Sequence, residues 1–502
     1  MLTALILTPL AGALLLTTMR EDSTQAVSRV KQTALLATVV AFAVAMLLWL
    51  QFDSASSEMQ FTVKYAAFPH DSFNVGTGVG GVSVSNNTSY FNMHLGLDGL
   101  SLYFVLLTAF TMPICVLASW CNVQHSVKSY MIALLVLQSL LTTAFVVQDL
   151  LLFYVFFEAV LVPLFVLVGV WGASADRVRA AFLLFLYTLL GSLFMLLAFI
   201  VIASATGTTD LQVLSLAGVN FAKQQWLWIA IFASLAVKTP LFPMHIWLSR
   251  AHVQASVAVS MILAGLVLKL ATYAYVRILL PMLPEASSYY GPLVQTVCVV
   301  TLIYSSLTTL RQTDFKVLVA YSSVAHMSVV VIGLFSNSLQ GIEGALLLSI
   351  AHGLVSPALF YCLGGVLYDR YHTRQLRYYR GLLQYMPVFA MLLFMFVLGN
   401  MSTPLTLNWI GELLALLGAM QRSAVVGAAM STGIVLSACY SIWLYARMTG
   451  GTWSPYLGYA VDVTRREVMV LLPLLATMLV FGVCPNIILT DLHYSVTALL
   501  NS

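Results

Sequence analysis

Charge is scarce in this sequence. Charged side chains make up only 8% of its 502 residues, whereas they supply roughly a quarter of an ordinary soluble domain. That scarcity excludes a soluble globular protein. Apolar residues make up 61% instead, which is enough for about fourteen membrane-spanning helices of about 22 residues each. The composition therefore predicts a polytopic membrane protein.

Three further features are missing. No stretch alternates apolar and polar residues between turn signals, as a transmembrane barrel requires, so the predicted fold is all-α. The six cysteines include no C-x-x-C pair and are interpreted as small core residues, so we expect neither a metal site nor a bound cofactor in this chain. The first residues carry no basic segment ahead of the apolar stretch, so we expect a first span there and not a cleaved signal.

Apolar windows between polar breaks define the predicted spans. Two of them have the pattern of broken helices, because the seventh contains Pro240 just after Lys238 and the twelfth, too long for one straight helix, carries Pro404 in its middle. The fourteen windows lie near residues 2–18, 33–51, 95–119, 129–147, 150–171, 180–205, 226–247, 255–280, 290–310, 317–336, 344–367, 383–418, 424–447 and 467–489.

The basic residues indicate which loops share a side of the membrane. Of the 22 Lys and Arg, sixteen fall in loops after odd-numbered spans, Lys316 among them, and four fall in loops after even-numbered spans. Basic loops stay on the cytoplasmic or matrix side. We therefore expect both termini, and the long loop at about 52–94, on the opposite, outer side.

A short match between two segments of the sequence predicts an internal repeat. KTPL at 238–241, followed by Trp247, is matched 164 residues later by STPL at 402–405, followed by Trp409. Two inverted five-helix repeats would place these segments equivalently with opposite topology, although a coincidental match is the alternative. The predicted division is 1–128 for spans 1–3 with the outer-side loop, 129–280 for the first repeat, 281–448 for the second repeat and 449–502 for the last span.

Four ionisable residues fall well inside the predicted spans: Glu158, Lys238, Lys269 and Glu412. A charge at the bilayer centre costs about 2.5–3.5 kcal/mol on insertion scales, so such residues usually pair or line a water-filled route. A buried lysine and a facing carboxylate can exchange protons, which favours a proton relay. The alternative is two ion pairs that only fix helix register. We favour the relay, because apolar residues would fill a structural core at lower cost.

Three histidines, His245, His326 and His352, lie in or beside the same spans, where imidazoles can pass protons between neighbours. His326 and His352 could instead each be a core residue bonded to a backbone carbonyl. His245, just past Pro240, could equally be a local helix cap. The residues alone leave these alternatives open.

Six blocks of the sequence carry a resemblance to a known family. They lie in order at 95–104 (LGLDGLSLYF), 151–172, 232–273, 310–330, 350–374 and 408–416 (NWIGELLAL). Together they resemble the chain 4, or M-type, antiporter-like subunits of proton-pumping NADH:ubiquinone oxidoreductase, respiratory complex I. Glu412 stands where M-type subunits have glutamate and other antiporter-like relatives usually have lysine. The chain is also too short for the lateral helix of the L-type subunits.

The resemblance implies a role for each interior residue. Glu158 would pair with Lys238 on the broken seventh span, and Lys269 would be the central relay group. His326 and His352 would extend the relay to Glu412, the terminal proton donor or acceptor, with His245, Pro240 and Pro404 in support. The sequence departs from the family pattern around the start of the eighth span, at Ser249, Gln254, Ser256 and Val259, which puts the local geometry in question.

The resemblance also implies an activity and a setting. The chain would be a proton-translocating subunit of an enzyme complex, coupled to quinone reduction elsewhere. NAD, FMN, iron–sulfur clusters and ubiquinone would belong to other subunits, and no redox centre is expected here. Expected partners are the other membrane-arm subunits, including neighbouring antiporter-like subunits, and membrane lipids, with no nucleic acid.

The expected location is the mitochondrial inner membrane, because the wording of LYDRYHTRQLRYYRGLL (367–383) is closest to organelle-encoded versions of the family. Both termini would then face the intermembrane space; a bacterial plasma membrane is the alternative. Two other functional classes stay open. A subunit of a cation/proton antiporter uses much the same residues, and Glu412 argues against it. A purely structural membrane scaffold would not need the four interior charges.

Overall fold

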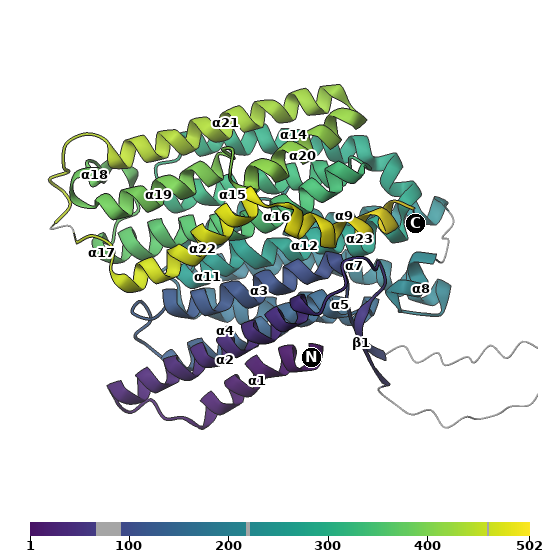
Figure 1. The fold of residues 1–502 in the computed structure, drawn as a ribbon, viewed down its shortest axis with the longest axis horizontal. Helices are drawn as coiled ribbons and strands as arrows, with labels where there is room; N and C mark the ends of the chain where they lie inside the picture. The colour runs from purple at the N-terminus through teal and green to yellow at the C-terminus, as the bar shows by residue number, and fades with distance from the viewer. Residues whose placement is uncertain (67–91, 217–220, 459–460, 502) are drawn as a thin grey trace, which may run out of the picture.

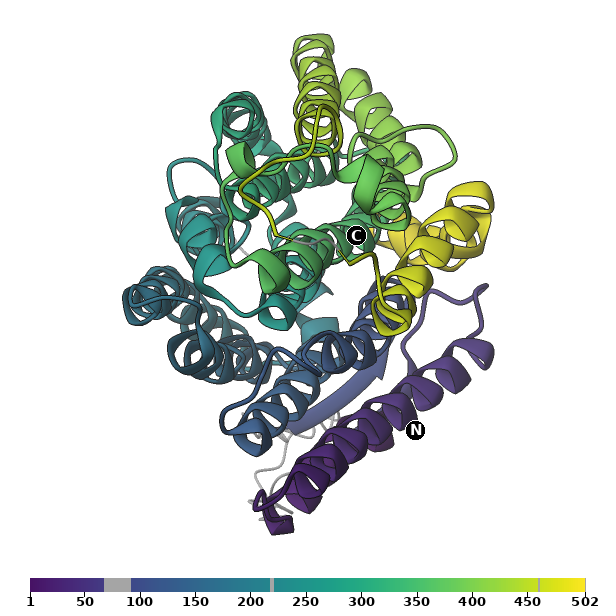
Figure 2. The ribbon, with the colours of Figure 1, turned by 90° about the vertical axis from the view of Figure 1, so that its left-hand side faces the viewer.

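The chain folds into a bundle of roughly parallel helices (Figure 1). The computed structural model describes residues 1–66, 92–216, 221–458 and 461–501, so most of the predicted outer-side loop, residues 67–91, lies outside the described residues. Figure 2 views the bundle along its helices, with the N-terminal helices α1 (Leu2–Thr18) and α2 (Thr24–Leu50) at one edge and α21 (Ala424–Thr449) at the opposite edge.

Helices account for nearly all of the described regular structure. Helical segments lie at each of the fourteen predicted windows, and eleven within the described residues are long and apolar enough to cross a membrane. The all-α membrane fold is therefore confirmed, whereas the number of spans and the inverted repeats stay predictions. The bounds after α2 are β1 (Gln60–Ala66), β2 (Asn92–Leu97), α3 (Gly99–Ala118), α4 (Val127–Val146), α5 (Leu150–Ala159), α6 (Leu161–Trp171), α7 (Arg177–Thr206), α8 (Leu211–Leu216), α9 (Phe221–Lys238), α10 (Ile246–Gln254), α11 (Val257–Ile262), η1 (Leu263–Val267), α12 (Leu268–Ala274), η2 (Tyr275–Leu279), α13 (Leu280–Met282), α14 (Pro284–Arg311), α15 (Phe315–Leu334), α16 (Leu339–Phe360), η3 (Tyr361–Tyr368), α17 (Asp369–Tyr371), η4 (Leu376–Tyr378), α18 (Leu382–Tyr385), α19 (Pro387–Asn400), α20 (Leu407–Arg422), α21, α22 (Arg465–Val483) and α23 (Asn486–Asn501).

Both predicted helix breaks are present. α9 ends at Lys238 and α10 begins at Ile246, with Pro240 between them, and Pro404 lies in the corresponding gap between α19 and α20. Proline has no N–H to continue the helical hydrogen bonds. Each break therefore leaves the end of a half-helix inside the protein.

Two features of the structure were not predicted from the sequence. The predicted outer-side loop contributes a two-stranded antiparallel sheet, in which Lys64 of β1 pairs with His94 of β2. The sequence predicts one helix over 467–489, but α22 ends at Val483 and α23 begins at Asn486. Pro485 lies between them, and its missing N–H prevents one continuous helix.

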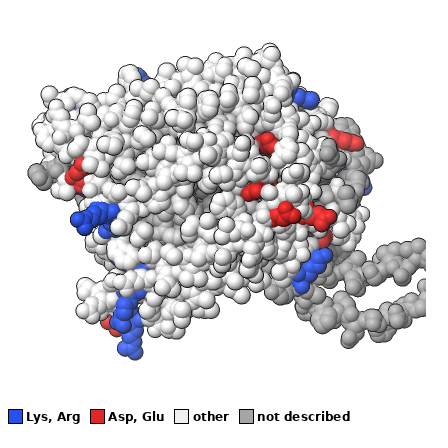
Figure 3. Space-filling model, viewed as in Figure 1, with Lys and Arg blue, Asp and Glu red and all other residues white. Residues whose placement is uncertain are grey.

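The predicted domain boundaries at 128, 280 and 448 each lie within two residues of the beginning or the end of a helix. The division into repeats remains a prediction, because the chain forms one bundle in which helices from all four parts lie side by side (Figure 2). In the face shown in Figure 3, no Lys or Arg is visible across the middle of the bundle, and the basic residues lie toward its two ends. That distribution suits a protein surrounded by lipid.

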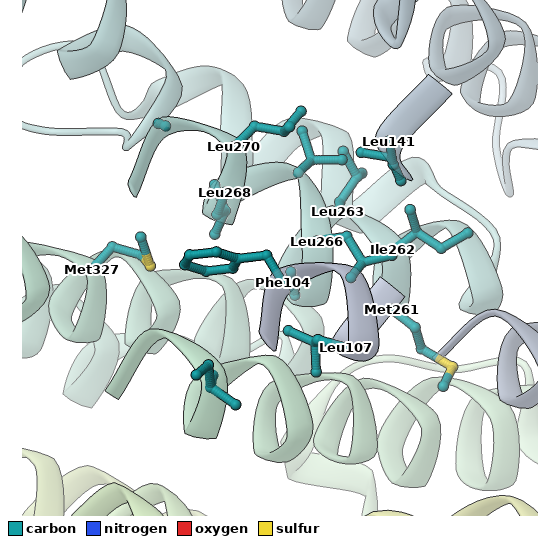
Figure 4. Close-up of a cluster of buried hydrophobic side chains, with 14 of the residues drawn as sticks. Phe104, Leu107, Leu141, Met261, Ile262, Leu263, Leu266, Leu268, Leu270 and Met327 are labelled. Atoms are coloured by element: carbon teal, nitrogen blue, oxygen red, sulfur yellow. The ribbon is translucent and has the colours of Figure 1, made fainter. Parts of the chain in front are cut away.

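The central helices are enclosed by the others. In Val257–Met282 and Leu339–Tyr371 the whole of the most apolar stretch is buried, against 33% in α2, α21 and α22. Figure 4 shows part of the apolar cluster that packs around the first of these segments, which includes Phe104 and Leu107 of α3 and Leu141 of α4. Polar groups placed on the central helices are therefore shielded from both lipid and water.

Glycines let α16 and α20 approach closely. A Cβ atom added at Gly344 would lie 2.5 Å from the backbone nitrogen of Ala415, and one added at Gly411 would lie 2.6 Å from that of Leu348. Small residues permit such close packing between helices in membranes. The contact fixes α20 against the centre of the bundle, including Glu412, which follows Gly411.

We expect Gly344→Ala to lower the stability of the protein, because the added methyl group has no space and overpacking typically costs about 1–3 kcal/mol. The measurement is the thermal unfolding midpoint of the purified assembly. Gly291→Ala in α14 is the matched control, since its Cβ would meet nothing within 4 Å and replacing a helical glycine by alanine favours the helix by about 0.5–1 kcal/mol. Equal midpoints for the two variants would contradict the close packing of α16 and α20.

Candidate functional site

Four buried side chains form a row across four helices. Lys269 Nζ on α12 lies 2.6 Å from His352 Nδ1 on α16, and His326 Nδ1 on α15 lies 2.9 Å from Glu412 Oε1 on α20. The centroids of the two imidazole rings are 5.8 Å apart. All four residues are at most 3% exposed. The structure thus brings together four of the predicted site residues, which we call the central row.

Two π-helical turns bracket the lysine of the central row. η1 precedes α12 and η2 follows it, and Lys269 Nζ donates a hydrogen bond to the Ala264 carbonyl in η1 at 2.6 Å. Single π-helical turns inside helices occur frequently at functional sites. The carbonyl gives the buried amine a second partner, which offsets part of the cost of its burial.

A second close approach brings this lysine to its histidine. A Cβ atom added at Gly265 in η1 would lie 2.9 Å from Pro357 Cγ and 3.3 Å from the Gly353 carbonyl oxygen. Gly353 follows His352 directly, so the backbones of η1 and α16 are in close contact here, without intervening side chains from the two glycines. The 2.6 Å contact between Lys269 and His352 depends on this packing.

Three atoms of the central row have no hydrogen-bond partner among the described residues: His326 Nε2, His352 Nε2 and Glu412 Oε2. An unpaired buried polar atom costs about 1–3 kcal/mol, so it calls for an explanation. Each imidazole has one nitrogen engaged in the row and the other available. The interpretation of His326 and His352 as core residues bonded to backbone carbonyls is therefore wrong.

Lys238 lies at the end of α9 and is 1% exposed. Its Nζ donates to the Phe157 carbonyl at 3.1 Å and lies 3.6 Å from the centroid of the Phe157 ring. The C-terminal end of a helix favours a cation, and so does the face of an aromatic ring. Lys238 is thus held without a carboxylate in direct contact.

Glu158, which follows Phe157 in α5, is only half-buried. It interacts electrostatically with Lys238, but the two side chains make no ion pair within 4.0 Å. The pair of Glu158 and Lys238 that the resemblance implies is therefore more distant than a salt bridge, because Lys238 donates its hydrogen bond to the Phe157 carbonyl. Val155 and Val162 nearby are 49% and 60% exposed, so Glu158 lies on an apolar face of the bundle.

His245 lies outside the central row. Its ring packs among those of Phe242, Tyr304 and Tyr321, with centroids 5.6–5.9 Å away. It occupies the position before α10, but its side chain makes no capping hydrogen bond, so the interpretation as a helix cap is wrong. The two prolines, Pro240 and Pro404, support the site by ending α9 and α19.

Two buried basic residues near the central row were missed by the sequence reasoning. His252, at the end of α10, is 0% exposed, stacks on Phe360 with centroids 4.5 Å apart, and interacts electrostatically with Lys269 and Lys316. Lys316 was assigned to an inner-side loop, yet it is 2% exposed and donates to the Ala255 carbonyl at 3.2 Å. Lys316 lies at the edge of an apolar window, a position that does not indicate from the sequence whether its side chain is buried.

Asn408 was also missed. It lies one turn before Glu412 on α20, is 0% exposed, and neither of its amide atoms has a partner among the described residues. An asparagine four positions before the interior glutamate would share its helix face. That spacing was the available signal.

The departures from the family pattern make local contacts. Ser256 Oγ lies 3.0 Å from the Tyr130 hydroxyl, and the Ser174 hydroxyl donates to Gln254 Oε1 at 2.7 Å. Ser249 Oγ donates to the Ile246 carbonyl at 3.1 Å and Val259 is fully buried. α11 still begins at Val257, and the central row is intact.

Metal ligands are not assembled anywhere in the described segments, where no group of three or more His, Cys, Asp or Glu could hold an ion. All six cysteines are free thiols, and Cys115, Cys298 and Cys362 are buried. The placement of redox cofactors in other subunits stays a prediction.

Comparison with known proteins adds a family. A family model described as "NADH:quinone oxidoreductase/Mrp antiporter, TM" matches residues 147–437. The chain is 57% identical over 502 residues to NADH-ubiquinone oxidoreductase chain 4 of Mycosarcoma maydis, covering 100% of both chains. It is 45% identical over 499 residues to the chain 4 protein of Arabidopsis thaliana, covering 99% of this chain and 96% of the relative.

A solved structure agrees with these relatives. A chain of respiratory complex I from Thermus thermophilus superposes with a TM-score of 0.86 at 27% identity, covering 100% of this chain and 99% of that chain. All four residues of the central row fall inside the segment that the family model matches. The chain therefore belongs to the NADH:quinone oxidoreductase/Mrp antiporter family, among its NADH-ubiquinone oxidoreductase chain 4 members.

Proposed function

We propose that this chain moves protons across the membrane through the central row, as a membrane-arm subunit of an NADH:ubiquinone oxidoreductase that reduces quinone elsewhere. The observation that carries the proposal is the pair of contacts at 2.6 Å and 2.9 Å, Lys269 to His352 and His326 to Glu412, in the interior of the bundle. Such contacts are short enough for direct proton transfer.

The row suits stepwise transfer. Protonated Lys269 donates to His352 Nδ1, and His352 releases a proton from Nε2 toward His326 Nε2. His326 Nδ1 then delivers a proton to Glu412 Oε1. Because each imidazole accepts on one nitrogen and releases from the other, one proton enters and one leaves at each step, and each ring must return to its first tautomer before the next cycle.

The unpartnered atoms favour this role over a structural one. Two ion pairs that served only to hold helices would be expected to have their polar atoms satisfied. Instead, His326 Nε2 and His352 Nε2 both lack a partner among the described residues, on two rings whose centroids are 5.8 Å apart. Glu412 is engaged by an imidazole and not by the set of oxygen ligands that a hard cation prefers. That contact favours protons over a cation/proton antiporter.

Coupling would act through Glu158 and Lys238. Glu158 lies on an exposed apolar face, where a neighbouring membrane-arm subunit or a lipid would cover it. A change of charge beside Glu158 alters the attraction that it exerts on Lys238, whose amine is otherwise held by Phe157 alone. Lys238 would then release or regain a proton and shift the protonation of Lys269.

Uptake would occur at the end of the bundle where α15 begins. A cavity of about 580 Å³ there is lined by residues that include Arg250, Asp314 and Tyr321. Burial raises the pKa of the Asp314 carboxyl, and nearby Arg374 opposes that rise. His252 interacts electrostatically with both Lys316 and Lys269, so Lys316 and His252 are the groups that would pass the proton inward.

The basic loops favour the matrix side of the mitochondrial inner membrane for this uptake end. Arg374, Arg377 and Arg380 lie in the segment between α17 and α18, at the same end. Basic segments stay on the matrix or cytoplasmic side. Both termini would then face the intermembrane space.

Two substitutions test the relay. In the assembled complex, we expect Glu412→Gln or Lys238→Ala to lower the number of protons moved per NADH oxidised, because a positioned proton-transfer group contributes about 10²–10⁴-fold to its step. The measurement is proton uptake into sealed vesicles alongside NADH oxidation. Glu285→Gln, an exposed acid at the start of α14, is the matched control. An unchanged proton yield in both relay variants would contradict the assignment of these residues to a proton relay.

A native gel tests the assembly. We expect the chain from mildly solubilised membranes to run in a very large complex that stains for NADH oxidation, since its relatives are chain 4 proteins of NADH-ubiquinone oxidoreductase. Migration in a smaller complex without that stain, together with sodium-dependent proton movement in vesicles, would replace the proposal by the antiporter alternative.

A further inference from the structure

A cavity of about 730 Å³ opens at the end of the bundle opposite the uptake end. Its wall includes Lys64 of β1, His94 of β2, Asp98 before α3, Arg277 of η2 and Ser495 of α23. None of these residues belongs to the relay described above. The cavity is hydrophilic enough to hold water, because ionisable groups from several elements face it.

An ion pair forms the floor of this cavity. Arg277 Nη1 lies 2.8 Å from Asp98 Oδ2, with side chains 13% and 4% exposed, and Arg277 Nη2 also donates to Gln148 Oε1. Asp98 additionally caps α3 by accepting a hydrogen bond from the Ser101 backbone. The pair is neutral overall, so it presents no net positive charge to an approaching proton.

A histidine–aspartate pair, His94 and Asp210, lies near this ion pair. His94 Nδ1 lies 3.2 Å from Asp210 Oδ2, and His94 is 4% exposed. Its Nε2 atom is buried and has no partner among the described residues. The charged groups around it are Asp210, Lys64 on the paired strand, and the Arg277–Asp98 pair. The carboxylate on one nitrogen stabilises a proton arriving at the other.

The same helix connects this cavity to the central row. Lys269, Tyr273 and Arg277 follow one another at intervals of four residues, which places them on one face of a helix at about 6 Å per step. Tyr273 is 1% exposed, its hydroxyl has no partner among the described residues, and it lies within electrostatic range of Arg277 and Asp98. On that face of the helix, the Tyr273 hydroxyl is therefore a polar group between Lys269 and the cavity wall.

Packing does not explain the Tyr273 hydroxyl. Its ring belongs to a cluster with Phe104, Phe145 and Phe153, and phenylalanine would fill the same space without leaving a buried hydroxyl unpaired. An unpaired buried hydroxyl is a net cost. The hydroxyl therefore has a use beyond packing.

We propose that this cavity is a proton-release site, reached from Lys269 through the Tyr273 hydroxyl, with His94 handing the proton to water. The inference rests on the proposed function and gives it an outlet beside that of Glu412. In each passage Lys269 gives up one proton, Tyr273 accepts one at its oxygen as it releases its own hydroxyl proton, and His94 Nε2 receives one and loses it to the cavity. The net change is one proton moved from Lys269 to the outer side.

Tyr273→Phe in the assembled complex is the first test, since it removes only the hydroxyl. In sealed vesicles we expect the proton yield per NADH to fall toward that of Glu412→Gln, with uncoupled NADH oxidation retained. His94→Gln should lower the yield in the same way. Tyr361→Phe in η3, which removes the hydroxyl of a tyrosine that is 2% exposed and lies outside the Lys269–Arg277 segment, should leave the yield unchanged.

The outcomes separate the two proposals. If Glu412→Gln lowers the yield and neither Tyr273→Phe nor His94→Gln does, the outlet is wrong and the proposed function stands. If Glu412→Gln and Lys238→Ala leave the yield unchanged, the proposed function fails by its own test. A fall with Tyr361→Phe equal to that with Tyr273→Phe would also overturn the outlet, because the effect would not depend on position.

Access from the outer side is the second test. Ser57→Cys places a thiol at an exposed position of the cavity wall, and we expect a membrane-impermeant methanethiosulfonate added from the outer side to label it and to lower the proton yield. Ser288→Cys, exposed at the start of α14, is the control whose labelling should leave the yield unchanged. Absence of labelling at Ser57→Cys, or labelling that leaves the proton yield unchanged, would overturn the proposal, since an outlet needs contact with outer water and a reagent bound in it would obstruct it.

Discussion

A buried ammonium group must be met by polar atoms, and much of this structure can be understood from how it meets that requirement. Lys269 is 0% exposed at the centre of an apolar bundle, where an isolated charge is costly. Its partners come from its own helix, through the Ala264 carbonyl, and from α16, through His352. The position of the lysine is therefore fixed only when two separate segments are correctly placed.

Glycines make that placement possible. The row requires α16 to touch η1 on one side and α20 on another, and Gly265 and Gly344 remove the side chains that would hold these segments apart. Larger residues would lengthen the contacts of His352 and Glu412 beyond hydrogen-bonding distance. The polar chemistry in the interior thus depends on apolar packing several residues away.

The sequence was sufficient to predict the fold class and the two helix breaks, because long apolar windows and prolines act locally. It also identified Lys269, His326, His352 and Glu412 as interior groups, which the structure brings into one row. Their neighbours could not be deduced, since contacts between helices depend on the facing of each helix and the sequence does not specify it. Lys238 illustrates the difficulty, because its nearest partner is a backbone carbonyl, an acceptor that every residue carries.

The position of a residue within an apolar window does not determine whether its side chain is buried. Lys316 stands at the edge of an apolar stretch and looked like a loop residue, yet neighbouring helices cover it. His252 falls just before a span and was passed over for the same reason. The last predicted span continues past Pro485 to residue 489 because hydropathy changes little there, whereas the backbone breaks and α22 ends at Val483.

The π-helical turns on either side of Lys269 constrain the number of residues that this helical segment can contain. A π-helical turn holds one residue more than the helix around it needs, and each residue of an α-helix advances the side chains by about 100°. Loss of one residue between Gly265 and Lys269 would leave this wide turn one residue short and would shift Lys269 relative to Gly265. The glycine that admits α16 and the lysine that meets it would then point to different neighbours. In this segment, the count of residues is as much a part of the site as their identity.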